Sequence, residues 1–215
     1  IPVKLMPILE PKRFKIMHGG RGGGKSHTVA QVLVMLSSMK NLRILCVREI
    51  QKSIAQSSMQ VIKDYIGRLG MTAYFEILKT EIKCKTTGST FAFIGLQDHT
   101  ADTIKSFEGV DIVWAEEASK ISANSWNILI PTIVRKEGAE IIATFNADQE
   151  SDYVYSRWVK GNDPDAWVCQ INWRDNPWFN EAMDSERLKL KALNDGLYDH
   201  VWEGAYVTAI EGAYY

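Results

Sequence analysis

Eight consecutive residues near the start of the chain have the spacing of a phosphate-binding loop. Residues 19–26 read Gly-Gly-Arg-Gly-Gly-Gly-Lys-Ser, which matches the pattern G-x-x-x-x-G-K-S. Glycine permits positive φ and has no side chain to keep backbone amides away from a phosphate. In such loops the lysine reaches the β and γ phosphates, and the serine hydroxyl ligates Mg²⁺. The pattern therefore predicts a site for a nucleoside triphosphate with Mg²⁺. The predicted nucleotide contacts are Gly19, Gly20, Arg21, Gly22, Gly23, Gly24, Lys25, Ser26 and His27.

The residues on either side of this loop predict a strand and a helix. An apolar run precedes the loop, and Val29, Leu33 and Leu36 follow it at helical spacing. This context separates a phosphate loop from the alternative, a glycine-rich surface turn. At the start of the helix, free N–H groups and the positive end of the helix dipole favour an anion.

Two acids directly follow a hydrophobic stretch later in the chain. Residues 111–117 read Asp-Ile-Val-Trp-Ala-Glu-Glu. We expect Glu116 to hold Mg²⁺ together with Ser26, and Glu117 to orient or deprotonate the attacking water. Many phosphate-loop enzymes have aspartate at the first of these positions. Asp111 is the rival acid, but it would lie about 15 Å away at the other end of the strand. The alternative for both glutamates is the solvated first turn of a helix.

Two further side chains are expected at the same site. Asn146 ends the next apolar strand and can hydrogen-bond the γ phosphate or the attacking water, although asparagine also ends strands in ordinary turns. Arg21 lies within the loop and can neutralise charge on the γ phosphate, as an arginine finger does. The alternative for Arg21 is a side chain that points to solvent or pairs with a neighbouring subunit. Arg48 and Arg135 are candidate cross-subunit arginines, although a structural role is favoured for each.

The base of the nucleotide has no clear recognition motif in the sequence. From position alone, we expect Lys12, Arg13 and Phe14 to stack on the base or flank it.

The apolar runs of the chain predict a mostly parallel sheet flanked by helices. Strands and helices alternate, which favours an α/β fold with ligands at the carboxyl ends of the strands. A hairpin-like stretch predicts added antiparallel strands. A long helix is expected over 53–69 and a polar helix over 181–194, the second closed by Gly196. The predicted strands are 14–17, 43–47, 74–78, 81–85, 90–94, 110–115, 140–145 and 167–171.

Composition excludes several classes of protein. The 215 residues carry a formal net charge of −1, so contact with nucleic acid must come from a local basic cluster. Lys83 with Lys85, and Arg187 with Lys191, are such pairs, although solvated surfaces produce them routinely. The three cysteines are widely spaced in apolar surroundings, which indicates buried thiols in a reducing compartment. We find no apolar stretch of about 20 residues and no cleavable signal, so we expect neither a membrane span nor secretion.

These residues and several further runs resemble the large terminase subunit of tailed bacteriophages, almost from end to end. In overall pattern the chain is similar to terminases of headful-packaging, short-tailed phages. The runs that carry the resemblance are 19–26, 104–109, 114–118, 131–135, 144–146, 152–155, 175–179 and 198–204.

The resemblance implies a phosphate-loop NTPase of the ASCE type that uses ATP and Mg²⁺. Its catalytic residues would be Glu117, Lys25, Arg21 and Asn146, with Ser26 and Glu116 as metal ligands. Members of the family form a ring on the portal of an empty capsid and pull double-stranded DNA inside. The implied partners are therefore double-stranded DNA, the portal protein, the small terminase subunit and further copies of the chain, with no membrane. The implied location is the host cytoplasm, transiently at the procapsid portal.

The resemblance also implies a division of the chain into domains. We expect an ATPase domain over 1–172, a small helical linker subdomain over 173–210 and, at 211–215, the start of a nuclease domain that the chain lacks. The linker is expected to pack on the ATPase body through Trp173, Trp178 and Trp202.

Two other functions fit the same residues. One is another ASCE-type DNA translocase or helicase, which would share each chemical residue named above. The other is a non-hydrolysing assembly module that binds nucleotide only to fix its shape.

Overall fold

The computed structural model describes residues 1–50, 57–97 and 107–206. Its centre is an eight-stranded sheet with the order β3-β4-β5-β2-β6-β7-β1-β8. The six strands from β5 to β8 in that order run parallel, while β3 and β4 form an antiparallel extension at one edge. The strands are β1 (Phe14–His18), β2 (Arg43–Arg48), β3 (Phe75–Ile77), β4 (Glu81–Cys84), β5 (Thr90–Gly95), β6 (Ile112–Glu116), β7 (Glu140–Phe145) and β8 (Ala166–Gln170).

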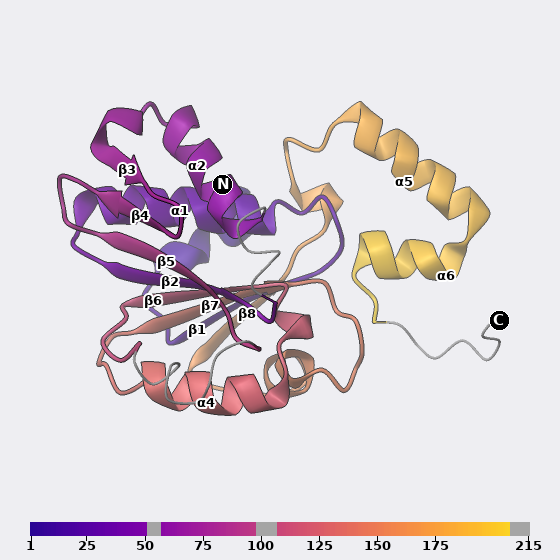
Figure 1. Ribbon diagram of the computed structural model, residues 1–215. Helices are drawn as coiled ribbons and strands as arrows, with labels where there is room; N and C mark the ends of the chain where they lie inside the picture. The colour runs from indigo at the N-terminus through magenta and orange to yellow at the C-terminus, as the bar shows by residue number, and fades with distance from the viewer. Residues whose placement is uncertain (51–56, 98–106, 207–215) are drawn as a thin grey trace.

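Helices cover both faces of this sheet, and a helical segment projects from one end (Figure 1). Helices α1 and α2 lie on one face and α4 on the other. The projecting segment contains α5, α6 and η7. The helical elements are η1 (Val3–Leu9), α1 (Lys25–Met39), α2 (Ser58–Arg68), η3 (Thr72–Tyr74), η4 (Ala118–Lys120), α4 (Ala123–Ile133), η5 (Tyr155–Val159), η6 (Trp173–Asp175), α5 (Glu181–Leu193), α6 (Asp195–Tyr198) and η7 (Asp199–Glu203).

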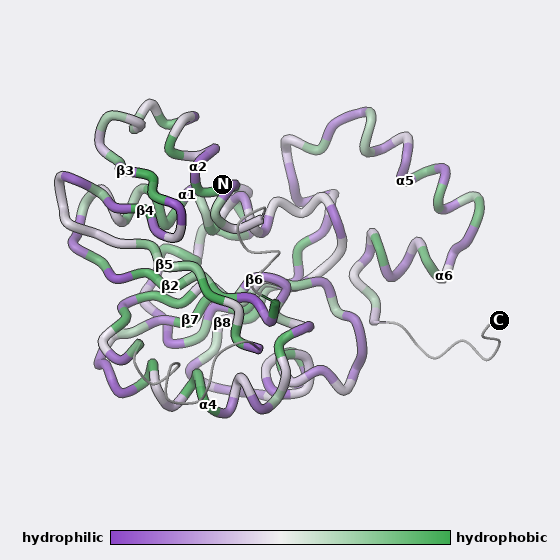
Figure 2. Tube along the Cα trace, in the orientation of Figure 1, coloured by the Kyte–Doolittle hydropathy of each residue, from purple (hydrophilic) through white to green (hydrophobic). Residues whose placement is uncertain are grey.

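The alternation of side chains along each strand produces two cores. In β2, Ile44 and Cys46 face the core under α1 and α2, while Leu45 and Val47 face the core under α4. Because both faces are covered, the central strands read as continuous apolar runs, as in parallel sheets generally. Figure 2 shows these strands as largely hydrophobic, whereas α5 alternates between polar and apolar residues. Within the described ranges, no helix is both long enough and apolar enough to cross a membrane.

The strand register brings three strand ends to one level. His18 of β1 pairs with Phe145 of β7, and Thr144 of β7 pairs with Glu116 of β6. The residues that follow these strands are the phosphate loop, Asn146 and Glu117. They therefore leave the sheet side by side at its carboxyl edge.

The predicted fold class and the predicted strands are confirmed, with boundaries shifted by at most two residues. The helix expected over 53–69 is present as α2 from Ser58, and residues 53–56 lie outside the described part of the chain. The helix expected over 181–194 is present as α5. The prediction that Gly196 closes it is wrong, since Asn194 caps a further short helix, α6, that contains Gly196. Of the linker expected over 173–210, residues 207–210 are outside the described ranges, as are residues 211–215.

Candidate active site

The phosphate loop lies between the end of β1 and the start of α1. Gly22 and Gly24 have φ of 80° and 76°, a conformation in which side chains are strained. Gly24 is also the residue that caps α1, and it offers no side-chain oxygen to the amides of the first turn. By contrast, α4 and α5 begin with Ser122 and Asn180, whose side chains accept from such amides. The start of α1 is therefore suited to an external anion.

Lys25 joins the loop to the end of β7. Its Nζ donates to Gly19 O and Gly20 O, each at 2.8 Å, and to Asn146 Oδ1 at 2.9 Å. Burial lowers the pKa of Lys25 to about 7, although these acceptors favour the charged form. The structure thus places Asn146 beside the loop lysine, as expected from the two motifs.

The two acids after β6 occupy different environments. Glu116 is buried and accepts a hydrogen bond from Ser58 Oγ at 2.9 Å. Glu117 is the one non-glycine residue with positive φ, at 50°, among the described residues, and its side chain is 62% exposed. Such backbone strain costs about 1–3 kcal/mol and clusters at active sites. The rival acid Asp111 lies at the amino end of β6, where its Oδ1 pairs with Lys136 at 2.6 Å.

Arg48, at the end of β2, holds both acids. Its Nε lies 3.6 Å from Glu116 Oε2, its Nη2 pairs with Glu117, and its Nη1 donates to Ser57 Oγ at 3.0 Å. Because Arg48 is 6% exposed and bound within the chain, it has the structural role that the sequence favoured over a cross-subunit one. The sequence pattern that could have indicated a role for Arg48 at this site is a charged residue directly after an apolar strand. Arg135 is half exposed beside Glu108, and its cross-subunit role stays a prediction.

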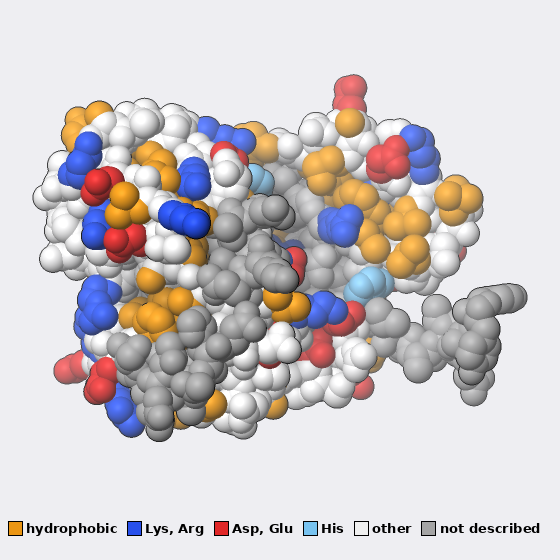
Figure 3. Space-filling view, viewed as in Figure 1, with side chains coloured by type: hydrophobic (Ala, Val, Ile, Leu, Met, Phe, Trp, Pro, Cys, Tyr) orange, Lys and Arg blue, Asp and Glu red, His pale blue; other side chains and the backbone are white. Residues whose placement is uncertain are grey.

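Lys25, the two acids and Asn146 line one cavity of about 360 Å³ at the carboxyl edge of the sheet. It contains six residues predicted from the sequence and adds Lys120, Asp148 and His200. Lys120, which follows β6, pairs with Asp148, which follows the neighbouring strand β7. Figure 3 shows the hollow between the sheet and the projecting helices, with acidic and basic side chains at its edge. The predicted residues in the cavity are Arg21, Lys25, Ser26, Glu116, Glu117 and Asn146.

A second cavity, of about 810 Å³, continues from the loop on the side of α1 and α2. The glycines from Gly20 to Gly24 and His27 line it, together with aromatic and polar side chains from three parts of the chain. This volume suits a drug-sized ligand. The lining residues outside the loop are Ile1, Pro2, Thr28, Gln31, Tyr65, Arg68, Asn146, Asn176, Trp178, Asn180 and Met183.

The expected base contacts at the start of β1 are wrong. Arg13 donates to the carbonyl oxygens of Val134 and Lys136, and Phe14 packs on Trp158 with ring centroids 5.2 Å apart. These residues lie at the amino end of β1, about 17 Å from the loop by the rise of a strand. The error came from reading proximity in sequence as proximity in space.

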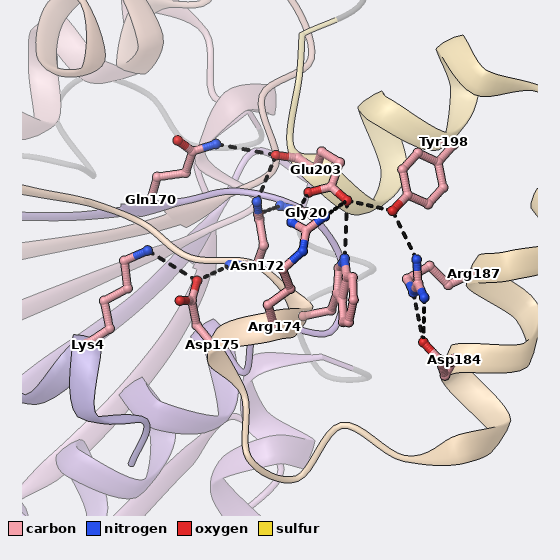
Figure 4. Close-up of polar contacts among 11 residues, drawn as sticks. Lys4, Gly20, Gln170, Asn172, Arg174, Asp175, Asp184, Arg187, Tyr198 and Glu203 are labelled. Carbon is pink, nitrogen blue, oxygen red and sulfur yellow. Dashed lines mark hydrogen bonds and ion pairs between the residues drawn. The ribbon is translucent and has the colours of Figure 1, made fainter. Parts of the chain in front are cut away.

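The segment after β8 binds the loop directly, as Figure 4 shows for Gly20 and Asn172. Gly20 N donates to Asn172 Oδ1 at 2.8 Å, and Arg21 N donates to Val201 O at 2.7 Å. Asn176 Nδ2 donates to Gly22 O at 2.6 Å. A Cβ at Gly20 would lie 2.0 Å from the carbonyl oxygen of Trp202, so only glycine fits there.

Glu203 is the common hydrogen-bond acceptor for several side chains of this segment (Figure 4). It accepts from Arg174, from Trp173 Nε1 at 3.3 Å and from Tyr198 Oη at 2.6 Å, and Tyr198 accepts from Arg187. Burial alone would raise the pKa of Glu203, but hydrogen bonds from Arg174, Tyr198 and Trp173 outweigh it and lower the pKa.

The aromatic contacts of Trp173 and Trp202 lie within the linker itself, so their expected packing on the ATPase body stays a prediction. Trp202 is 7% exposed, and Phe179 packs between it and Trp173, with centroid distances of 5.9 and 5.4 Å. The expectation for Trp178 is wrong, because this side chain is 65% exposed at the rim of the second cavity.

The oxygen atoms beside the two acids are suitable ligands for a magnesium ion. Ser26 and Glu116 line the same cavity and offer hard oxygen atoms. No group of three His, Cys, Asp or Glu side chains gathers as a metal cage anywhere in the described ranges. Mg²⁺ does not need one, because it is held by one or two carboxylates with water and substrate phosphates.

The sheet order and the loop define an α/β protein of the phosphate-loop class, in which β7 separates the loop strand from the acid strand. Residues 11–205 match the family model of the phage terminase large subunit, and the chain belongs to this family.

The chain is 24% identical over 149 residues to the PBSX phage terminase large subunit of Bacillus subtilis, covering 68% of this chain and 34% of that protein. It is 22% identical over 203 residues to the large terminase subunit of Bacillus phage SPP1, covering 88% and 48%. The chain therefore spans a third to a half of these relatives.

Solved terminase structures share the fold. The large terminase of a thermophilic bacteriophage superposes with a TM-score of 0.78 at 12% identity, over 95% of this chain and 52% of that one. The large terminase ATPase domain of Thermus phage P74-26 gives a TM-score of 0.63 at 14% identity, over 94% and 93%. At such identities the likeness establishes the fold alone.

Proposed function

We propose that this chain hydrolyses ATP and, as the motor part of a terminase large subunit, powers the movement of double-stranded viral DNA into a procapsid. One observation carries the proposal: Lys25 of the phosphate loop and the acid pair Glu116 and Glu117 line a single cavity. The large terminase of the thermophilic bacteriophage was solved in complex with ADP and with ATP-gamma-S, which supports the choice of ATP.

The proposed reaction is in-line attack of water on the γ phosphate. Glu117 orients the water and accepts its proton, while Lys25 and Arg21 balance the charge on the phosphate oxygens. Asn146, already bonded to Lys25, positions the phosphate or the water. Positioning and electrostatics supply most of the catalysis in such reactions.

Ser26 and Glu116 are the proposed Mg²⁺ ligands. When bound, the ion supplies positive charge at the β and γ phosphate oxygens. The base and ribose are assigned to the second cavity, where Tyr65 and His27 contact each other edge to face at 5.9 Å and offer aromatic surface.

The proposed assembly follows the family. We assign residues 1–172 to the ATPase domain, 173–210 to the linker subdomain and 211–215 to the start of a nuclease domain. The proposed subtype is that of headful-packaging, short-tailed phages. The proposed partners are double-stranded DNA, the portal protein, the small terminase subunit and further copies in a ring, in the host cytoplasm and transiently at the portal.

Phosphate release with Mg²⁺-ATP at high protein concentration tests the hydrolysis. We expect slow turnover by the chain and none by Lys25→Ala, because the loop loses its phosphate-binding cation. Lys79→Ala is the matched control, since Lys79 is exposed in the turn between β3 and β4. Binding of ATP without turnover by the unaltered chain would favour the assembly module and overturn the proposal.

The motor function is tested on the full-length protein with procapsids and portal. We expect ATP-dependent protection of DNA from an added nuclease, and loss of protection with Lys25→Ala. Strand separation without protection would favour the helicase alternative.

A further inference from the structure

His200 lines the cavity that would hold the γ phosphate, together with Lys25 and Glu117. It belongs to η7, a π-helical turn that follows α6. Turns of this type occur frequently at functional sites. Among the described residues, His200 is the one cavity residue contributed by the segment after β8, since each of the other described lining residues comes from the loop or from the ends of β6 and β7.

The backbone around His200 is fixed to the phosphate loop. Its neighbour Val201 accepts from Arg21 N at 2.7 Å. Gly204 lies against the loop as well, because a Cβ there would approach Gly19 Cα to 2.5 Å. These contacts on both sides of η7 hold His200 at a defined distance from the loop and therefore from any phosphate that the loop binds.

The imidazole ring is also oriented. Its Nδ1 lies 2.8 Å from Ala205 O. Because a carbonyl oxygen can only accept, Nδ1 carries the hydrogen of this bond. Nε2 is then the ring nitrogen left to contact a ligand.

We propose that His200 contacts the γ phosphate through one bound water, which donates one hydrogen to Nε2 and the other to a γ-phosphate oxygen. This inference rests on the proposed ATP site. The contact forms with a triphosphate and is lost with a diphosphate, so that the segment after β8 senses whether the γ phosphate is present. His200 is thus a specificity-determining residue for the triphosphate state.

Two substitutions of His200 distinguish the contribution of Nδ1 from that of Nε2. The amide of His200→Asn can still donate to Ala205 O in place of Nδ1, but it removes Nε2. The longer His200→Gln places an amide near the position of Nε2. Binding of ATP-gamma-S and of ADP, each with Mg²⁺, is measured by calorimetry for the chain and for both variants. Thermal melting without nucleotide reports whether each variant is folded.

We expect His200→Asn to weaken ATP-gamma-S binding roughly tenfold, equivalent to about 1.4 kcal/mol, and to change ADP binding less than twofold. His200→Gln should recover at least part of the loss. Equal weakening of both nucleotides would assign His200 a structural role only, and unchanged binding of both would remove it from the site. If the unaltered chain binds neither nucleotide, the ATP site itself fails and the inference with it. If it binds both and only the His200→Asn result differs from expectation, the ATP site stands.

Discussion

Lys25 is buried, and we propose that it binds the phosphates of ATP. Burial lowers the pKa of Lys25 to about 7, so we expect a large fraction of this lysine to be neutral at pH 8 in the free protein. Phosphate oxygens at the loop would restore the charged form. Binding of ATP-gamma-S at pH 8 should therefore take up about one proton, and binding at pH 6 almost none from this group. Calorimetry in buffers of different ionisation enthalpy measures the uptake.

The matched control for this experiment is Lys79→Ala, which should take up the same number of protons. An observed enthalpy that is independent of the buffer at pH 8 would show that Lys25 is already charged before the nucleotide binds.

His18 makes the fold sensitive to acid. Burial, with a smaller contribution from Lys25, lowers its pKa from 6.5 to about 4. The unfolded chain then binds more protons than the folded chain between these values, so stability is lost as the pH falls from about 6.5 towards 4. We expect this loss to amount to about 2 kcal/mol at pH 5.

His18→Phe tests this contribution. The ring of His18 stacks on Phe145 at 5.9 Å, so phenylalanine retains an aromatic contact and removes the titration. Urea unfolding at pH 7 and pH 5 should show a smaller loss of stability for the variant than for the unaltered chain. Equal losses for the two proteins would contradict the assignment.

At the level of secondary structure, the connection from β8 to η6 holds the segment 173–203 on the sheet. Asn172 accepts from Gly20 N and donates to Glu203 O at 3.0 Å. Asn172→Ala leaves a partly buried N–H without its acceptor, which costs about 1–3 kcal/mol. We expect chemical denaturation to show this loss, and hydrogen exchange to show lower protection in α5 and α6 than in the sheet.

Asn180→Ala is the control for that experiment, because the Asn180 side chain caps α5 by accepting from Met183 N at 2.9 Å, a hydrogen bond that does not reach the phosphate loop. Its effect should be limited to α5. Equal loss of protection in sheet and linker for Asn172→Ala would show that the two parts unfold together.

The parallel sheet and the acid edge were predictable because their signals are local. Apolar runs mark the strands, and parallel strands that alternate with helices end at one edge, so Ser26, Glu116 and Asn146 had to meet there. The partners of these residues were not predictable. Arg48 approaches the acids from another strand, and Asn172 meets Gly20 across 152 positions of sequence. The second cavity, to which we assign the base, was not predictable for the same reason, since Tyr65 and Trp178 belong to elements far apart in the chain.

At the scale of the whole protein, the phosphate loop connects the sheet to the segment after β8. It follows strand β1 of the sheet and is hydrogen-bonded to that segment. Val201, Asn172 and Asn176 each bond to the loop, so a ligand that orders the loop should also order this segment. We expect saturating ATP-gamma-S with Mg²⁺ to increase hydrogen-exchange protection over residues 173–203. Protection that nucleotide leaves unchanged there, while it rises in α1, would show that the loop and the linker are not coupled.

Glu117 is the residue whose role decides whether this cavity hydrolyses ATP. In a single-turnover experiment with enzyme in excess, Glu117→Gln should bind ATP within a few-fold of the unaltered chain and release phosphate at least about 100-fold more slowly, the usual effect of losing a general base. Bound, intact ATP recovered from the variant is the predicted result. Phosphate release at the unaltered rate would contradict the assignment of Glu117 and the mechanism proposed for this site.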